Sequence, residues 1–194
     1  MGMAGFVTGL FRNFVRMKPL IETPPRSIME VYKNLPEGTL AELINNVLYM
    51  SPSLATDHQE TLKKIFRALD SQIEKEGRGI VLFAPYDVYF DETGNAVQPD
   101  IIVIMKDNPG SVEARGHFHG SPDLIIEILS PGNKDHDLIT KKDLYEKFGV
   151  GEYWIVDSET RLSVGYKLEN GRYRKIDDRI GEIKSPLVGG PIKF

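Results

Sequence analysis

The sequence predicts an α/β protein in which a mixed central β-sheet is flanked by helices. Two apolar runs, QPDIIVIM and PDLIIEIL, are continuous enough to be strands covered on both faces. Apolar residues at helical spacing in DHQETLKKIFRALDSQI and DLITKKDLYEKFGV supply the covering layers. With 194 residues and a 41% hydrophobic share, the chain suffices for one domain with a sizeable core.

Residues 1–25 are expected to be an extension of a single domain that spans residues 26–194. Apolar residues in MGMAGFVTGLFRNFVRMKPL recur at the spacing of an amphipathic helix, and the basic residues there have no acidic counterpart. We expect this helix to pack on the domain or on a second subunit. It is too short and too often interrupted to cross a bilayer, so no stable membrane insertion is expected.

The first half of the domain predicts alternating helices and strands. SIMEVYKNLP predicts a short helix, and TLAELINNVLYMSP predicts an acid-bearing turn followed by a strand. The helix that begins near His58 ends near Gly77, and IVLFAPYDVYF follows as one strand. The turn residues from Asp91 to Asn95 predict a hairpin into QPDIIVIM. The segment DNPGSVEARGHFHGSPD then predicts a long, flexible loop.

The second half predicts a buried strand, YWIVD, followed by a C-terminal β-hairpin. Its strands are residues 162–166 and 173–176, joined across Asn170-Gly171. The tail GGPIKF either adds an edge strand or lies loose. The absence of cysteine excludes disulfides and thiolate-bound zinc, and it suits a cytoplasmic protein.

Acidic residues accompany both central strands, with Asp100 at the head of one and Glu127 inside the other. Burying a carboxylate among apolar residues costs on the order of several kcal/mol unless a positive or hydrogen-bonding group meets it. A divalent metal ion is the usual partner of converging acids. The pair therefore predicts a metal site.

A lysine is expected to point inward from the helix that follows. At about 100° per residue, Lys141 projects from the middle of the apolar stripe. An ion pair, for which Asp137 one turn earlier is available, or a role at a reaction centre would hold it there. A lysine that snorkels to solvent is the structural alternative. The stripe itself consists of Leu138, Leu144, Tyr145 and Phe148.

Two acids and an inward lysine are the minimum equipment for metal-assisted hydrolysis of phosphodiesters. The acids hold Mg²⁺ or Mn²⁺, which lowers the pKa of a bound water and offsets charge in the transition state. Lys141 orients the water or adds positive charge. Asp87 in APYDVYF is a weaker candidate, since an outward-facing strand position explains it equally well.

The order of these residues carries a family resemblance. Asp100, Glu127 and Lys141, with SPDLIIEILSP leading into a helix and then GVGEYWIVD, resemble the Uma-two family of the PD-(D/E)XK restriction-endonuclease-like superfamily. The resemblance runs from about Ile28 to Pro186. It implies a restriction-endonuclease-like core and an endonuclease that uses Mg²⁺ or Mn²⁺ and acts on nucleic acid, with DNA preferred. A homodimer would allow both strands of a duplex to be cut.

The resemblance also implies further site residues. The backbone carbonyl of Ile128 would complete the coordination, and Glu42 would be an early acid from the first helix or the turn after it. The helical spacing places His58 one turn before Leu62 on the same inward face, which makes it a candidate for contact with substrate phosphate or for stabilising a ligand. A solvated glutamate and a histidine satisfied in the core are the respective structural alternatives. Asp137 completes the set of additional candidates.

Two positions depart from the pattern of the superfamily. The superfamily lysine usually stands two residues after the strand acid, where this chain has Leu129. The resemblance places the lysine instead on the following helix, at Lys141. The second departure is Asn46, where the family commonly has a glycine, so we expect a differently built turn after Glu42.

The acidic net charge keeps functions other than a nuclease under consideration. A formal charge of −4 argues against strong, indiscriminate DNA binding. A nuclease fold that no longer cuts, and serves as an interaction module, is therefore the alternative. A histidine-bound metal at His117 and His119, with His58 or His136 as third ligand, is less favoured because the H-x-H lacks a strand signal. Two basic groups are local candidates for contact with DNA, although a solvated face is the favoured interpretation of each: Lys63, Lys64 and Arg67, and Arg172, Arg174 and Lys175.

Overall fold

The computed structural model describes residues 24–51, 55–113, 116–129 and 136–194, except for the side chains of residues 136 and 137. The predicted extension at residues 1–23 lies outside this part. A six-stranded mixed sheet, here called the central sheet, has the order β12-β11-β10-β9-β6-β3, and only β9 and β10 are parallel neighbours. Its strands are β3 (Gly79–Phe83), β6 (Ile101–Met105), β9 (Leu124–Leu129), β10 (Glu152–Asp157), β11 (Leu162–Glu169) and β12 (Arg172–Ile180).

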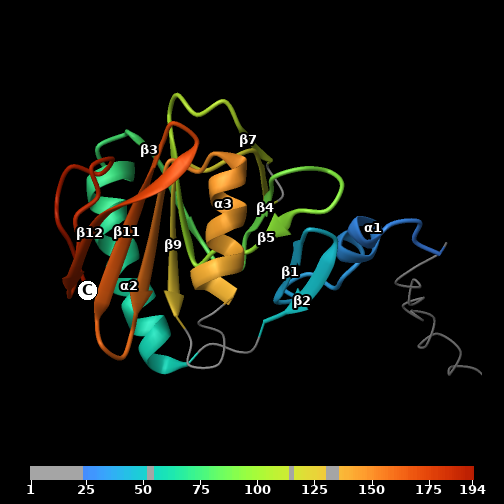
Figure 1. Cartoon of the computed structure of the whole chain (residues 1–194), viewed down its shortest axis with the longest axis horizontal. Helices are drawn as coiled ribbons and strands as arrows, with labels where there is room; N and C mark the ends of the chain where they lie inside the picture. The colour runs from blue at the N-terminus through green and yellow to red at the C-terminus, as the bar shows by residue number, and fades with distance from the viewer. Residues whose placement is uncertain (1–23, 52–54, 114–115, 130–135) are drawn as a thin grey trace, which may run out of the picture.

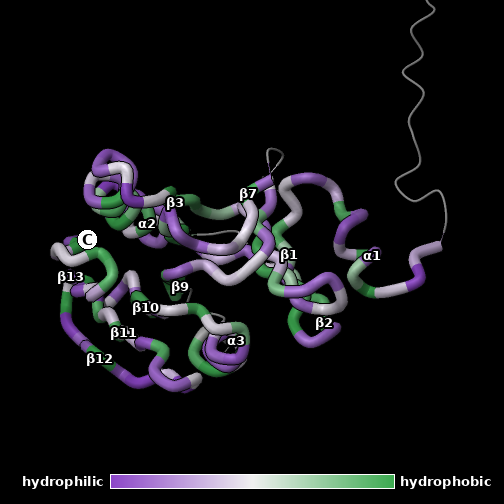
Figure 2. Tube along the Cα trace, turned by 90° about the horizontal axis from the view of Figure 1, so that it is seen from above, coloured by the Kyte–Doolittle hydropathy of each residue, from purple (hydrophilic) through white to green (hydrophobic). Residues whose placement is uncertain are grey.

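Helices cover both faces of the central sheet, as the two continuous apolar runs predicted. Helix α2 (Thr56–Leu69), continued by the π-helical η1 (Asp70–Glu74), lies on one face and α3 (Lys142–Phe148) on the other (Figures 1 and 2). Alternate residues of β9 divide between them: Ile126 and Ile128 join the core under α2, and Ile125 and Leu129 join the core under α3. The expected α/β architecture is confirmed.

A second six-stranded sheet, here called the side sheet, was not predicted. Its order is β2-β1-β5-β4-β8-β7, and α1 (Ile28–Lys33) packs on the face turned away from α3. The strands have only two to four residues, too few for a period-two pattern to stand out. They are β1 (Ala41–Ile44), β2 (Val47–Met50), β4 (Asp87–Tyr89), β5 (Ala96–Val97), β7 (Ser111–Glu113) and β8 (His117–His119).

Two predictions fail because of the side sheet. The single strand expected over residues 80–90 is divided, since β3 pairs with β6 in the central sheet whereas β4 pairs with β5 and β8. Pro85 lies at the break, where it cannot donate a ladder hydrogen bond. The loop expected over residues 107–123 contains β7 and β8, which the fully buried Phe118 anchors in the core under α3.

The helix expected over residues 135–149 is also divided. A π-helical turn, η2 (His136–Lys141), precedes α3, which ends at Gly149 with φ +81°. Because the π-turn is wider than an α-turn, it changes the helical phase, and Leu138 is exposed instead of facing inward as predicted. Lys141, Leu144 and Tyr145 are buried, as the pattern predicted.

The turn after Glu42 links the two hairpins of the side sheet. Asn45 and Asn46 have φ values of 49° and 63°, a conformation that asparagine tolerates better than most residues, so Asn46 can replace a glycine. The backbone N–H of Asn45 donates to Asn95 Oδ1 at 2.9 Å, in the turn between β4 and β5. Glu42 itself lies in β1, not in a helix or turn as the resemblance implied.

The C-terminal hairpin, β11 and β12, is confirmed, with Asn170 and Gly171 at its turn. The tail forms a separate two-stranded sheet from β13 (Glu182–Ile183) and β14 (Ile192–Lys193), and Phe194 packs in the core under α2. Among the described residues, no helix is both long and apolar enough to cross a membrane.

The carboxylate of Asp91 holds the turn between β4 and β5 together. Asp91 accepts hydrogen bonds from the backbone of Thr93 and Gly94 and from Asn95 Nδ2. Burial alone would raise the pKa of Asp91, but these hydrogen bonds outweigh it and lower the pKa from 3.8 to about 2. The carboxylate therefore stabilises the fold above the unfolded-state pKa, and this stability is lost as pH falls through the folded-state value.

Asp91→Asn should lower the free energy of unfolding by about 1 kcal/mol at neutral pH, as expected for weakened hydrogen bonds to a charged group. The difference from wild type should shrink between about pH 5 and pH 2 in urea titrations. Asp107→Asn, at an exposed aspartate, is the control and should change little at any pH. A gap that stays constant with pH would contradict the assignment.

Candidate active site

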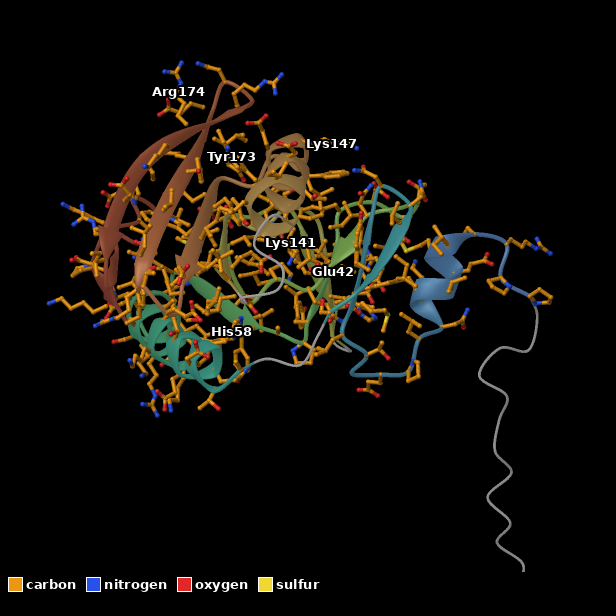
Figure 3. The ribbon with its side chains drawn as sticks, turned by 60° about the horizontal axis from the view of Figure 1, so that its bottom comes forward. Glu42, His58, Lys141, Lys147, Tyr173 and Arg174 are labelled. Atoms are coloured by element: carbon orange, nitrogen blue, oxygen red, sulfur yellow. The ribbon has the colours of Figure 1, made fainter. Side chains whose placement is uncertain are left out.

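Five charged or titratable side chains form a chain of contacts that runs from the side sheet, through the central sheet, to α2. Three come from strands or their ends, and two come from the helical layers: the first turn of α2 and the junction of η2 with α3 (Figure 3). All are almost completely buried, so each must be compensated by a neighbour. They are Glu42, His58, Asp100, Glu127 and Lys141, with exposed fractions of 3%, 2%, 8%, 2% and 6%.

Lys141 bridges the side sheet and the central sheet. Its Nζ lies 3.0 Å from Glu42 Oε1 and 3.1 Å from Glu127 Oε1. The inward orientation is as predicted, but these two partners are distant in sequence, whereas the partner suggested by sequence was Asp137. The side chain of Asp137 lies outside the described residues.

Tyr145 completes the environment of Glu127. Its hydroxyl donates to Glu127 Oε1 at 2.6 Å. Burial raises the pKa of Tyr145 well above 10, with the charges of Glu127 and Glu42 adding to the effect, so the phenol keeps its proton and remains a donor. Sequence reasoning used Tyr145 only as a core residue, although its place four residues after Lys141 puts both side chains on one helix face.

Asp100 lies beside Glu127 and is fixed by the next strand and by α2. Its Oδ2 accepts from the backbone N–H of Ile128 at 2.7 Å and lies 3.1 Å from His58 Nε2. The backbone N–H of Asp100 points to Glu127 Oε2 at 3.4 Å. The two acids predicted from the apolar runs are therefore neighbours.

His58 faces inward, as predicted, and its partner is Asp100. Burial alone would lower the pKa of His58, but the hydrogen bond and the negative charge of Asp100, together with the backbone of Ile128, raise it above 6.5. The negative charge of Asp100 thus favours a positively charged group beside it.

A second residue missed from sequence is Gln98, which connects the site to the far side of the side sheet. Its backbone N–H donates to Glu42 Oε1 at 3.1 Å, and its side-chain Nε2 donates to Asp87 Oδ1 at 2.9 Å. Asp87, a weaker candidate, therefore lies outside the cluster but one residue away from it. No sequence pattern distinguished Gln98, because its role depends on the unpredicted side sheet.

The histidines of the H-x-H segment lie in β8, contrary to the prediction of a loop without strand character. Both are on the α1 side of the side sheet, near Tyr89, and not in the cluster. The basic residues of the C-terminal hairpin are also distant: Arg174 lies at the end of the molecule away from His58 (Figure 3).

The donor atoms of the cluster suit a hard cation better than zinc. In the described ranges, no three or more His, Asp and Glu side chains are arranged to hold a metal ion. What the cluster offers is the oxygen atoms of two adjacent carboxylates, from Asp100 and Glu127, and the backbone N–H of Ile128 fixes that of Asp100. Mg²⁺ commonly takes one or two carboxylates and completes its octahedron with water, so this oxygen set fits it.

The fold is restriction-endonuclease-like, and comparison with known proteins identifies the family. The family model of Uma2, described as "Putative restriction endonuclease", matches residues 29–187. The chain belongs to this family. The resemblance inferred from about residue 28 to 186 is thereby confirmed.

A solved structure shows the same fold. The crystal structure of a "putative nuclease belonging to DUF820" from Anabaena variabilis superposes with a TM-score of 0.68, at 20% sequence identity. The match covers 85% of this chain and 92% of that chain. No curated protein matches the sequence.

The ion pairs of Lys141 predict a large effect on stability. Lys141→Met should lower the free energy of unfolding by about 3 kcal/mol, because Glu42 and Glu127 would stay buried without their cation. Lys142→Met is the matched control. It removes a half-buried lysine that lies 4.3 Å from the centre of the Tyr166 ring, and it should cost only about 0.5–1 kcal/mol.

Adding Glu42→Gln to Lys141→Met should recover part of the lost stability in denaturant titrations, since one of the two facing charges is removed. Equal effects of the Lys141 and Lys142 variants would contradict the buried ion pairs.

Proposed function

We propose that this protein is a nuclease that uses Mg²⁺ or Mn²⁺ to hydrolyse phosphodiester bonds of nucleic acid, with DNA as the preferred substrate. The observation that carries the proposal is the buried contact of Lys141 with Glu127, next to Asp100. Membership of the Uma2 family supports the same reaction class.

Asp100, Glu127 and the backbone carbonyl of Ile128 would hold the cation. When bound there, a divalent cation lowers the pKa of a coordinated water and offsets negative charge on the phosphate. The hydrogen bonds from Ile128 N–H to Asp100 and from Tyr145 to Glu127 fix the two carboxylates before any ligand arrives.

Lys141 would orient the attacking water and add positive charge next to the scissile phosphate. Glu42 holds the lysine from the opposite side and so acts as a positioning residue. This arrangement explains how this chain can dispense with a lysine on the strand. The ammonium group reaches Glu127 from the helical side, while Leu129, at the usual lysine position, packs in the core under α3.

Substrate contacts are proposed to come from α2, the helix that begins beside Asp100. Lys63, Lys64 and Arg67 are exposed on this helix. Because these basic residues are few and the net charge is −4, we expect the affinity for nucleic acid to be weak and to fall further as the salt concentration rises. His58, at the start of the same helix and 3.1 Å from Asp100, would meet a phosphate once Asp100 holds a cation.

Calorimetry with Mg²⁺ and Mn²⁺, together with nicking of supercoiled plasmid, tests the proposal. Glu127→Gln should abolish cation binding and reduce nicking by about a hundredfold or more. Glu152→Gln is the matched control, because Glu152 is an equally buried acid on the neighbouring strand, paired with Leu124 and hydrogen-bonded to Trp154, Ser185 and Leu187. It should bind the cation and nick DNA like the wild type.

A wild-type protein that binds neither cation would contradict the proposal and favour a nuclease fold retained as an interaction module. Cation binding that survives Glu127→Gln would place the metal elsewhere.

A further inference from the structure

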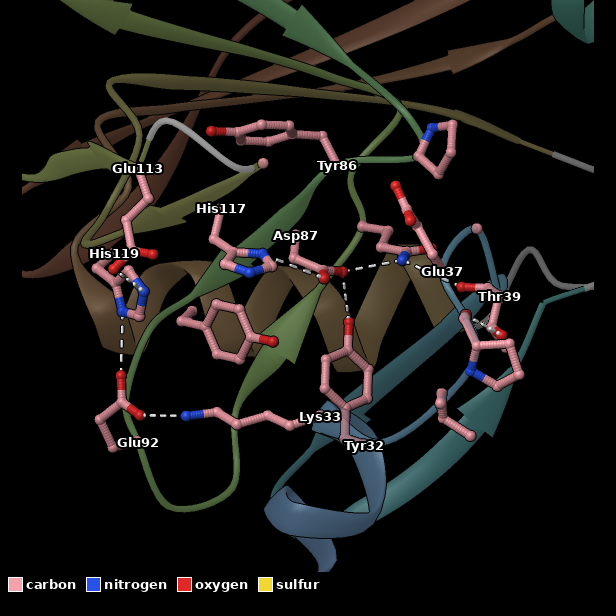
Figure 4. A pocket seen from close by; sticks show the side chains of 17 residues that line it. Tyr32, Lys33, Glu37, Thr39, Tyr86, Asp87, Glu92, Glu113, His117 and His119 are labelled. Atoms are coloured by element: carbon pink, nitrogen blue, oxygen red, sulfur yellow. Dashed lines mark hydrogen bonds and ion pairs between the residues drawn. The ribbon is translucent and has the colours of Figure 1, made fainter. Parts of the chain in front are cut away.

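A cavity of about 1100 Å³ lies on the α1 side of the side sheet, between that sheet and the segment 32–39 (Figure 4). Strand alternation separates it from the cluster of acids. Val88 and Phe118 face the core under α3, so their neighbours Asp87, Tyr89, His117 and His119 face the cavity. Glu42 shares the opposite face of the sheet with Ile44, and none of the five cluster residues lines the cavity.

A fixed carboxylate stands at the centre of this cavity. Asp87 Oδ1 accepts from the hydroxyl of Tyr32 at 2.7 Å and from Gln98 Nε2 at 2.9 Å. Its Oδ2 has no hydrogen bond from the described residues and lies 3.6 Å from His117 Nδ1. The hydrogen bonds to Oδ1 thus hold the side chain in place, and Oδ2 can still accept a hydrogen bond from a ligand.

Aromatic rings surround Asp87. Tyr89 is stacked on His119 at 5.0 Å between ring centres and meets Tyr32 and His117 edge-on at 6.1 and 5.4 Å. Tyr86 brings a further ring, and its Oη is buried with no hydrogen-bond partner in the described residues, as is His117 Nδ1. These rings give the cavity an aromatic lining beside the carboxylate of Asp87.

The charges around the cavity select the sign of such a ligand. Four carboxylates line it, from Glu37, Asp87, Glu92 and Glu113, against one lysine, Lys33, which gives −3 when the histidines are neutral and −1 when both are charged. Phosphates and other anions are therefore disfavoured. Among the residues that the structure describes, no group of three or more His, Asp and Glu side chains is arranged to hold a metal ion.

We propose that this cavity binds an organic cation, a ligand whose amine, amidine or guanidinium group meets Asp87 Oδ2 and whose body lies among the rings of Tyr86 and Tyr89. Aromatic faces attract such cations, and the partly buried carboxylate of Asp87 supplies the counter-charge. A free small amine and a basic side chain of another protein share this chemistry. The proposal is independent of nuclease activity, because the cavity contains none of the proposed catalytic residues.

Calorimetry on the full chain, without nucleic acid or divalent cation, tests the proposal with three molecules of one shape. Benzamidine is a planar cation, benzamide is its neutral isostere and benzoate is the anion. Benzamidine should bind about tenfold more tightly than benzamide, and benzoate should not bind.

Asp87→Asn should weaken benzamidine binding by about tenfold, whereas Asp107→Asn, the same change at an exposed position outside the cavity, should not alter it. If Asp87→Asn fails to fold, Glu113→Gln provides the test, because Glu113 is exposed and its loss should also weaken binding. Agmatine and a short arginine peptide then distinguish the two sources, since a free amine requires agmatine to bind and a protein partner requires the peptide to bind more tightly.

The proposal would be overturned if none of the organic cations, benzamidine, agmatine or the arginine peptide, binds the wild type. Equal affinity for benzamidine and benzamide, or full affinity in the Asp87 and Glu113 variants, would also overturn it. None of these outcomes bears on cation-dependent nicking, so the two proposals fail separately.

Discussion

The burial of Lys141 between Glu42 and Glu127 is the constraint on which the site depends. A buried positive charge and a buried negative charge must be held in contact with each other, because burying an unpaired ion costs on the order of several kcal/mol. Here the three partners come from β1, β9 and the start of α3, so the ion pairs require both sheets and the helix to be in place together. The fold brings distant segments to one point, and Asp100 with His58 lies beside it.

Burial of an acid does not by itself identify a site, as Glu152 shows. Glu152 is as buried as Glu127, but neutral donors satisfy it: the indole of Trp154, the hydroxyl of Ser185 and the backbone of Leu187. These contacts attach the C-terminal segment to β10. Glu127 instead meets a lysine and a second acid, a combination that stability alone does not require. The nature of the partners, more than the burial, separates the candidate active site from a structural carboxylate.

The central sheet and its acids could be predicted from sequence because their signals are local. Asp100 and Glu127 stand out against continuous apolar strands, and Lys141 against an apolar helix face. The side sheet could not, since strands of two to four residues carry little periodicity, and so Glu42 was placed in a turn and His117 and His119 in a loop. The π-turn before α3 likewise has no sequence signature, which explains the wrong placement of Leu138. The ion-pair partners of Lys141 could not be predicted either, because Glu42 and Glu127 are distant from it in sequence and neither the strand pattern nor the helix pattern relates them to it.

Anomalous scattering from crystals soaked in Mn²⁺ would show whether Asp100 and Glu127 form one cation site, because it locates the metal without reference to activity. We expect an anomalous peak in contact with the carboxylates of Asp100 and Glu127 and the carbonyl of Ile128. A peak at His117 and His119 instead, or no peak at the acid pair at millimolar Mn²⁺, would contradict it.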